Sequence, residues 1–251
     1  MQRTVNRVAV VVFDCDSTLT AVEGIDELAA EQRSAVEELT YAAMRGELPL
    51  EAVYGRRLGM IRPDRAQVDA LGERYIEALV PDAVELMAAL RAEGIEVRIM
   101  SGGLLPAVLA VAAVLGVPAD AVAAVGITFD CDGGYAGFDA ASPLARSGGK
   151  LDLLRTWRAG VSGRIMMVGD GATDLEAADA ADVFVAYAGV AERAAVVAEA
   201  DVVIRSTSLA PVLPLALGGQ RPADAAAGVL FDRGVGLLEE QYRSLVQHSS
   251  G

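Results

Sequence analysis

Residues 8–16 read Val-Ala-Val-Val-Val-Phe-Asp-Cys-Asp, and this stretch decides the fold class. Six apolar residues in a row, four of them β-branched valines, are typical of a strand buried on both faces, and such strands lie in parallel sheets. Asp14 and Asp16 follow where that strand should end, on the same side of the pleat. Because the carboxyl ends of strands in open α/β sheets border the ligand crevice, both carboxylates are predicted to face one site. Such a site needs positive charge, and a hard divalent cation such as Mg²⁺ would supply it.

The composition is that of a globular protein. The chain has 251 residues, of which 53% are hydrophobic and 22% charged, which suffices for one large domain or for a core domain with an insert. Twenty-one basic and thirty-five acidic residues give a net charge of −14. Nucleic acids and anionic membranes bind basic surfaces, so we expect neither as a partner.

Cysteine and histidine usage narrows the chemistry further. Cys15 and Cys131 are too few for a disulfide framework, and the apolar start is too short to span a membrane. Without a leader-like start, we expect a cytoplasmic protein. The sole histidine, His248, lies in a polar tail, so Ser-His-Asp chemistry and histidine-rich metal sites are excluded. Carboxylates must therefore carry the mechanism.

Strand and helix patterns alternate along most of the chain. After the first strand, apolar strand patterns recur at 95–100, 121–129, 164–168, 183–188 and 202–204. Helical patterns lie between them, at 81–93, 104–115, from 150, at 175–181 and at 190–200. This alternation predicts an α/β fold with a doubly wound, mostly parallel, Rossmann-like sheet.

Two segments stand outside this alternation. Residues 21–78 are rich in Ala, Glu, Leu and Arg, and we expect them to form a small helical cap that closes over a substrate. The core domain would then comprise residues 1–20 and 79–220. Residues 221–251 are expected to form a C-terminal extension, with one or two surface helices over 223–246 and a disordered end.

The tetrapeptide Phe-Asp-Cys-Asp occurs twice. The second copy, residues 129–132, precedes Gly133-Gly134 and the strand-like residues 135–138. Gly-Gly between two strand patterns is typical of a hairpin turn, so we expect the second pair of carboxylates to lie in solvent. We expect Cys15, between the first pair, to point away from them into the core as an inert thiol.

Polar groups at several predicted element ends fit phosphoryl transfer. These groups are Asp14 and Asp16, Ser101, Lys150, and Asp170 with Asp174. A carboxylate can attack phosphorus and hold the phosphoryl group, while a second carboxylate protonates the leaving oxygen and later activates water. A metal ion and a lysine offset the negative charge, and a serine with glycine amides binds phosphoryl oxygens.

Four segments together resemble the motifs of the haloacid dehalogenase-like phosphatases. They are Asp14-Cys-Asp-Ser-Thr18, Ser101-Gly-Gly103, Lys150 and Gly169-Asp-Gly-Ala-Thr-Asp174. The closer resemblance is to the phosphoserine phosphatase family, because linking segments such as 23–28 and 135–139 match as well, over residues 8–217. It implies Mg²⁺-dependent hydrolysis of O-phosphoserine through an aspartyl-phosphate, the last step of serine biosynthesis. We expect a monomer or homodimer.

The resemblance also implies a role for each matching residue. Asp14 would be the nucleophile and Asp16 the general acid and base. Mg²⁺ would be held by the Asp14 carboxylate, the Asp16 backbone carbonyl and Asp170, with Asp174 orienting the metal shell. Ser101, Gly102 and Lys150 would bind the phosphoryl group, and Thr173 would lie near it. Glu23 would bind an ammonium of the substrate and Arg57 a carboxylate. Met44 would give an apolar contact. At Leu50 the family often has a phenylalanine, so this wall of the pocket would be looser.

Other interpretations stay open at the level of sequence. Glu23 and Arg57 lie in a block where many acidic and basic side chains only face solvent. Ser101 could cap a helix, Lys150 could be a surface lysine, and Gly-Asp-Gly around Asp170 is common in turns. The substrate could be another small phosphomonoester, such as a phosphorylated amino alcohol or sugar. Transfer to an acceptor alcohol and a non-catalytic phosphate-binding regulatory module are further alternatives.

Overall fold

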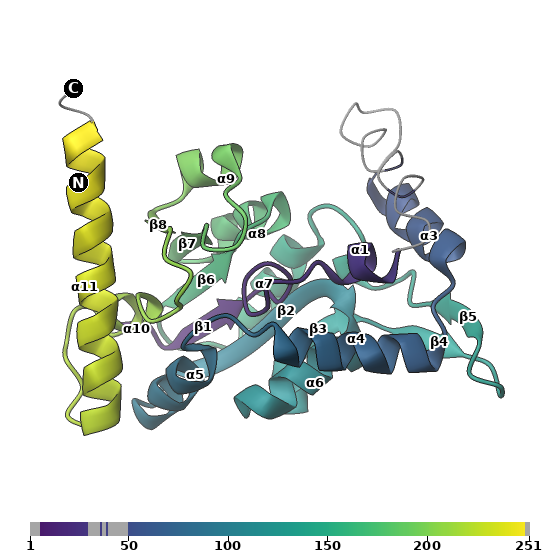
Figure 1. Cartoon of the computed structure of the whole chain (residues 1–251), viewed down its shortest axis with the longest axis horizontal. Helices are drawn as coiled ribbons and strands as arrows, with labels where there is room; N and C mark the ends of the chain where they lie inside the picture. Colours follow the sequence, from purple (N-terminus) through teal and green to yellow (C-terminus); the bar gives the residue numbers. More distant parts are fainter. Residues whose placement is uncertain (1–5, 30–35, 37–38, 40–49, 249–251) are drawn as a thin grey trace.

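A parallel sheet of six strands forms the centre of the computed structural model, which describes residues 6–29, 36, 39 and 50–248 (Figure 1). The strands are β1 (Val10–Phe13), β2 (Glu96–Leu104), β3 (Val122–Val125), β6 (Ile165–Gly169), β7 (Val183–Tyr187) and β8 (Val202–Ile204). Their order across the sheet is β3-β2-β1-β6-β7-β8, and each neighbouring pair is parallel. The predicted doubly wound α/β fold is confirmed.

The first strand lies in the middle of this sheet. Val10 of β1 pairs with Glu96 of β2 on one side and with Ile165 of β6 on the other, and β1 is buried along its whole length. The strand order runs outward in opposite directions from the boundary between β1 and β6. Ligands bind at such a switch point, beyond the carboxyl ends of the two strands. The residues that follow β1 and β6 therefore border the crevice.

Helices cover both faces of the sheet, and β1 contributes alternate side chains to the two cores. Val11 and Phe13 pack in one core and Val10 and Val12 in the other, as a strand with a two-residue period requires. The first core holds helices α5 (Ala83–Ala92), α6 (Leu105–Leu115), α10 (Val212–Ala216) and α11 (Ala225–His248). The second holds α7 (Gly149–Arg158), α8 (Ala172–Ala177) and α9 (Ala194–Glu199).

The described part of the segment after β1 is helical, as its composition indicates. Its described elements are α1 (Gly24–Leu28), α3 (Leu50–Ile61) and α4 (Arg65–Glu77). Helix α4 begins with a capping box, in which Asp64 accepts from the backbone of Gln67 and the Gln67 side chain accepts from the backbone of Asp64. It lies against α6 (Figure 1), where Gly72 lets the two helices approach closely.

The second Phe-Asp-Cys-Asp lies on a hairpin turn, which confirms the prediction. Strands β4 (Ile127–Phe129) and β5 (Tyr135–Phe138) are antiparallel and form a separate sheet. Residues 130–132 are exposed, and Gly133 has a φ of 86°, which favours glycine in the turn.

The strand before Ser101 is longer than its sequence pattern indicates. We expected this strand to end at Met100, but β2 continues through Leu104, with a shift in its register against β3 between these two residues. Ser101 therefore lies inside a strand and does not cap α6, which begins at Leu105 without a side-chain cap. The difference arises because pairing with neighbouring strands, rather than local apolarity, sets the length of a central strand.

The C-terminal extension contains one helix whose inner side is part of the core. The expected surface position of residues 223–246 is wrong for Ala227, Leu230 and Phe231 of α11, which are buried in the same core as α5 and α10. Residues 249–251, where we expected disorder, lie outside the described residues.

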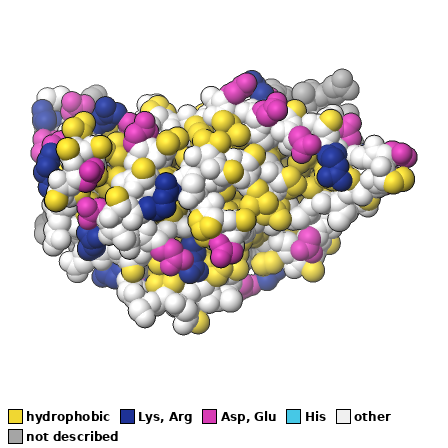
Figure 2. Space-filling model, turned by 90° about the horizontal axis from the view of Figure 1, so that it is seen from below, with side chains coloured by type: hydrophobic (Ala, Val, Ile, Leu, Met, Phe, Trp, Pro, Cys, Tyr) yellow, Lys and Arg dark blue, Asp and Glu magenta, His cyan; other side chains and the backbone are white. Residues whose placement is uncertain are grey.

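The acidic and basic side chains of the face in Figure 2 lie among apolar ones. None of the described helices combines the length and apolarity that a membrane span requires.

Candidate active site

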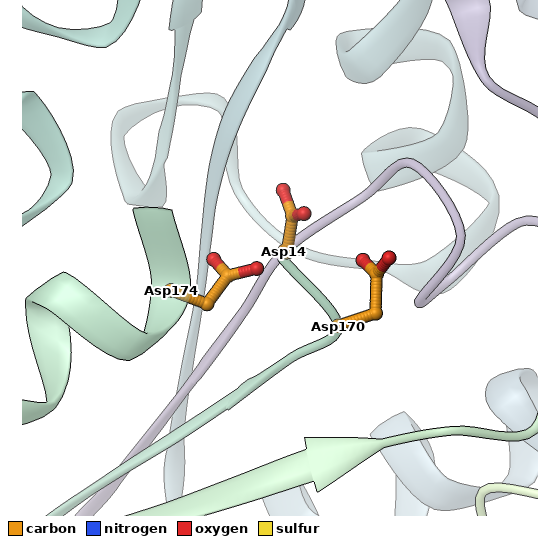
Figure 3. A group of neighbouring side chains, drawn as sticks. All are labelled: Asp14, Asp170 and Asp174. Atoms are coloured by element: carbon orange, nitrogen blue, oxygen red, sulfur yellow. The ribbon is translucent and has the colours of Figure 1, made fainter. Parts of the chain in front are cut away.

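Three carboxylates meet at the carboxyl edge of the sheet (Figure 3). Asp14 follows β1, Asp170 follows β6, and Asp174 lies in the first turn of α8. One oxygen from each lies within 4.8 Å of the others, and all three residues are buried. The parallel pairing of β1 with β6 brings the first two together, since the Asp14 amide donates to the Val168 carbonyl at 2.9 Å. A turn places the third, because Asp174 accepts from the Gly171 amide at 2.9 Å.

One buried lysine lies between two of these carboxylates. Lys150 Nζ is 2.8 Å from Asp14 Oδ1 and 2.6 Å from Asp174 Oδ1, and the residue is 5% exposed. It lies in the first turn of α7, and Gly149 before it is needed because a Cβ there would overlap the Pro143 carbonyl. Burial alone would lower the pKa of Lys150, but Asp14 and Asp174 raise it, so the lysine is a cation.

The cations beside the three carboxylates do not fully offset the negative charge of the cluster. Burial, followed by the charge of Asp174, raises the pKa of Asp14 well above its usual range. The same two causes raise the pKa of Asp170 to about 6, although Arg193 opposes them. Buried carboxylates that repel one another in this way are stabilised by a bound cation. The all-oxygen donor set of the three residues fits a divalent metal ion, as the sequence indicated.

Asp16 lies beside this cluster rather than inside it. It lines the same cavity as Asp14, which has a volume of about 390 Å³. Its Oδ1 accepts from the Gly24 amide at 2.7 Å and from the hydroxyl of Tyr75, and its Oδ2 accepts from Ser101 Oγ at 3.2 Å. The carboxylate is thus held apart from the acidic triad by donors from three different segments.

The Ser101-Gly-Gly segment borders the cavity from β2. Ser101 is buried and accepts from the Gly103 amide at 2.9 Å, and the Gly102 carbonyl accepts from Tyr54 at 2.8 Å. Gly102 and Gly103 line the cavity, and so does Thr173 at the start of α8. The structure therefore brings Gly102, Thr173 and Lys150, from three of the predicted phosphoryl-binding segments, to one cavity.

Two of the three predicted contacts from residues 21–78, Glu23 and Arg57, also reach the cavity, where each has a partner within the chain. Glu23 accepts from Ser17 at 2.7 Å and from Arg193 at 2.9 Å, while Arg57 pairs with Asp26. Burial is the main cause of the raised pKa of Glu23. Glu23 and Arg57 both line the cavity. Met44 lies outside the described residues, and Leu50 is the first residue of α3.

Sequence reasoning missed two residues of this site, Arg193 and Tyr75. Arg193 lies between β7 and α9 and bridges Glu23 and Asp170, with contacts of 2.9 Å and 2.8 Å. Its place after a parallel strand was a usable signal, because that edge of the sheet faces the crevice. Tyr75 offered none, since it follows Val68 and Leu71 at the helical spacing of an ordinary buried face.

Cys15 points into the core, as predicted. The residue is fully buried, and burial raises the pKa of its thiol well above the usual range. A protonated, inaccessible thiol is a poor nucleophile, so the reactive groups of the site are its carboxylates.

Comparisons with known proteins agree with this arrangement. A family model described as haloacid dehalogenase-like hydrolase matches residues 8–182. The chloroplastic phosphoserine phosphatase of Arabidopsis thaliana is 41% identical over 199 residues, which cover 77% of this chain and 68% of that protein. The phosphoserine phosphatase of Homo sapiens is 41% identical over 182 residues, which cover 71% and 81% of the two chains. A solved structure, a phospho-aspartyl intermediate analogue of phosphoserine phosphatase, matches with a TM-score of 0.67 and 26% identity and covers 83% of this chain and 98% of its own.

Proposed function

This chain belongs to the haloacid dehalogenase-like hydrolases, and we propose that it hydrolyses O-phosphoserine to serine and inorganic phosphate with Mg²⁺ as its cation. One observation carries the choice of substrate. The cavity that contains Asp14 is also lined by an acid, Glu23, and a base, Arg57. A phosphorylated amino acid carries an ammonium, a carboxylate and a phosphate. Glu23, Arg57 and Lys150 offer the opposite charge to each of these groups in turn.

In the first half of the proposed reaction, Asp14 is the nucleophile. One of its carboxylate oxygens forms a bond to phosphorus as the bond from phosphorus to the serine oxygen breaks. Asp16 donates its proton to that leaving oxygen, which departs as the serine hydroxyl. Lys150, 2.8 Å from Asp14, would hold the carboxylate and bind a phosphoryl oxygen, with Ser101 and Gly102 on the same side.

In the second half, water removes the phosphoryl group from Asp14. Asp16, now a carboxylate, accepts a proton from the water as the water oxygen bonds to phosphorus. The bond from phosphorus to Asp14 breaks, inorganic phosphate leaves, and Asp14 regains its charge. Asp16 keeps the proton that the next leaving group needs, so one residue serves both halves.

The proposed metal ligands are the carboxylates of Asp14 and Asp170 and the backbone carbonyl of Asp16, with Asp174 orienting the metal shell. Their fit rests on the all-oxygen donor set and on the raised pKa of Asp14 and of Asp170. When bound, Mg²⁺ supplies positive charge against the phosphate and the carboxylates. The residues of the chain hold that charge beside the nucleophile.

Substrate binding in this proposal exchanges ion pairs. Glu23 would leave Arg193 for the substrate ammonium, and Arg57 would leave Asp26 for the substrate carboxylate. Met44 would give an apolar contact, and Thr173 would lie near the phosphoryl group. We propose that residues 21–78 act as a cap over the core formed by residues 1–20 and 79–220, and that closure excludes water. The cytoplasmic location and the monomeric or homodimeric state remain predictions.

A substrate comparison tests this function. Phosphate release from phosphoserine and from phosphoethanolamine, its decarboxylated analogue, should be measured with Mg²⁺ and with a chelator. We expect hydrolysis that needs the cation and a clear preference for phosphoserine. Arg57→Ala should remove that preference. Arg62→Ala is the control and should keep it, because Arg62 donates to the Tyr135 carbonyl outside the cavity.

Three results would reject the proposal. Equal rates on both phosphomonoesters in the unaltered chain would contradict phosphoserine as the substrate. Release of serine without equal phosphate, when an alcohol is present, would identify transfer to the alcohol. Failure to hydrolyse even an activated aryl phosphate would favour a non-catalytic module.

A further inference from the structure

Helix α4 brings a buried phenol to the proposed acid and base of the reaction. Tyr75 is fully buried, and its hydroxyl donates to Oδ1 of Asp16. Burial, with the negative charge of Asp16 as a second cause, raises the pKa of Tyr75 well above its usual range. The phenol therefore keeps its proton and is a donor at neutral pH.

Two glycines provide the space for this contact. A Cβ at Gly24 would overlap the Tyr75 hydroxyl, and a Cβ at Gly103 would lie 2.8 Å from Asp16 Oδ2 and 3.4 Å from that hydroxyl. Gly24 is the first residue of α1 and Gly103 lies in β2, two elements that are distant in sequence. Backbone from two segments thus leaves just enough room for the phenol to reach the carboxylate.

The two oxygens of Asp16 have unequal surroundings. Oδ1 accepts from the Gly24 amide at 2.7 Å, which can only donate, and from the Tyr75 phenol, whose oxygen is a weaker acceptor than that of an aliphatic hydroxyl. Oδ2 has Ser101 Oγ at 3.2 Å, and a serine hydroxyl can donate to a carboxylate or accept from a carboxylic acid. A proton on Oδ1 would face the fixed amide proton of Gly24, whereas a proton on Oδ2 meets a serine hydroxyl that can accept it.

We propose that Tyr75 is a positioning residue that, with the Gly24 amide, occupies Oδ1 of Asp16 and makes Oδ2 the atom that gives and takes the proton. This inference rests on the proposed function, because it assigns the proton to one atom of that reaction. A Cβ at Gly103, which lines the cavity, would lie 2.8 Å from Oδ2. Oδ2 therefore lies beside the predicted phosphoryl-binding segment. The phenol contributes no proton to the reaction itself.

The leaving group offers a test that separates this role from a structural one. Serine leaves as a strongly basic alkoxide and needs the proton of Asp16, whereas p-nitrophenolate is a stable anion that leaves without one. Misplacing the Asp16 proton should therefore lower kcat/KM for phosphoserine and spare kcat/KM for p-nitrophenyl phosphate, since kcat/KM does not include the later attack of water on the aspartyl-phosphate. A general loss of structure would slow both substrates by the same factor.

The experiment compares Tyr75→Phe with the unaltered chain on these two substrates. We expect kcat/KM for phosphoserine to fall about tenfold or more, through kcat rather than KM, and kcat/KM for p-nitrophenyl phosphate to change by less than about threefold. Tyr187→Phe is the matched control. It removes a buried hydroxyl that donates to the Thr207 carbonyl away from the cavity, and we expect it to leave the ratio of the two kcat/KM values unchanged.

An equal fall on both substrates, or no fall on either, would overturn the role of Tyr75. The proposed function fails differently, through an unaltered chain that hydrolyses p-nitrophenyl phosphate but not phosphoserine. In that case phosphoethanolamine replaces phosphoserine as the alkyl substrate, because its alkoxide makes the same demand for a proton. The ratio in Tyr75→Phe then decides the role of Tyr75 alone.

Discussion

The chain contains Phe-Asp-Cys-Asp at residues 13–16 and again at 129–132, and the two copies have opposite surroundings. In the first copy Phe13, Asp14 and Cys15 are buried, and Asp14 lies beside Lys150. In the second copy residues 130–132 are exposed, and the Asp130 carboxylate accepts from the nearby backbone amides of Asp132 at 3.0 Å and Gly134 at 2.8 Å. The second pattern is that of an Asx turn. The same four residues thus form a reactive centre or a turn, depending on what surrounds them.

The difference in burial has chemical consequences. Burial raises the pKa of both Asp14 and Cys15, and it places the carboxylate where a cation and a phosphate can interact strongly with it. The hairpin copy remains hydrated, so its carboxylates interact weakly with any ligand. Identical side chains therefore offer matched variants for testing the first copy against the second.

The largest effect is expected from removing the nucleophile. Asp14→Asn should lower kcat for phosphoserine by about 10³-fold or more, because an amide cannot form the aspartyl-phosphate. Asp130→Asn, the same change in the second copy, should keep kcat/KM within about twofold. Phosphate release under Mg²⁺ measures both. Undiminished turnover by Asp14→Asn would refute the covalent mechanism.

Lys150, beside the first Phe-Asp-Cys-Asp, should contribute more to stability than Arg65, beside the second. Lys150→Ala leaves Asp14 and Asp174 buried without their partner and should lower the free energy of unfolding by about 3 kcal/mol. Arg65→Ala removes a cation–π contact of 4.7 Å with Phe129 and should cost about 0.5–1 kcal/mol. Urea unfolding in chelator checks both values. Equal losses would show that the ion pair at the first copy is no stronger than a surface contact.

The two cysteines should differ in their rate of alkylation. Cys131 is exposed, whereas Cys15 is fully buried and its pKa is raised by that burial, so native protein should react at Cys131 at least about tenfold faster. Mass spectrometry after iodoacetamide should find one modified thiol in native protein and two in urea. Rapid modification of Cys15 without denaturant would contradict the burial of the first copy.

The smallest effect concerns the pH dependence of stability without metal. The pKa of Asp170 is raised to about 6 in the folded state, above the value near 3.8 of an exposed Asp. A raised folded pKa means that the folded state binds the proton more tightly, so its stabilising contribution is present below pH 3.8 and is lost as pH rises through 6. Between pH 5 and 7 this loss should be about 1 kcal/mol.

Asp170→Asn tests the assignment of that loss. The variant should reduce the decline in unfolding free energy between pH 5 and 7, measured in chelator, by about 1 kcal/mol, while Asp130→Asn should keep it. A decline of the same size in Asp170→Asn would assign the pH dependence to another group.

Local pattern predicted the parts of the molecule that depend on neighbouring residues. The valine run of 8–12 predicted a strand buried on both faces, and β1 is that strand. Gly133-Gly134 predicted the hairpin turn that exposes the second Phe-Asp-Cys-Asp. The motif residues Asp14, Lys150, Asp170 and Asp174, once placed at element ends, came together because parallel strands share one carboxyl edge.

Contacts between residues that are distant in the chain could not be predicted from local sequence patterns. Tyr75 is 59 residues from Asp16, and Arg193 is 23 residues from Asp170 and 170 residues from Glu23. The burial of Leu230 and Phe231 likewise depends on how α11 meets α5 and α10. Each contact follows from the packing of whole helices and loops, which no local spacing encodes.

The sequence predicted the sheet, its central strand and the carboxylates at the edge, since the periodicity of each element and the alternation of strands and helices along the chain are local properties. The tertiary structure added the donors that no local pattern indicated, Arg193 at Asp170 and the Tyr75 phenol at Asp16. The physical reason is that a buried charge is stabilised by whichever groups packing brings within hydrogen-bond distance, wherever they lie in the chain.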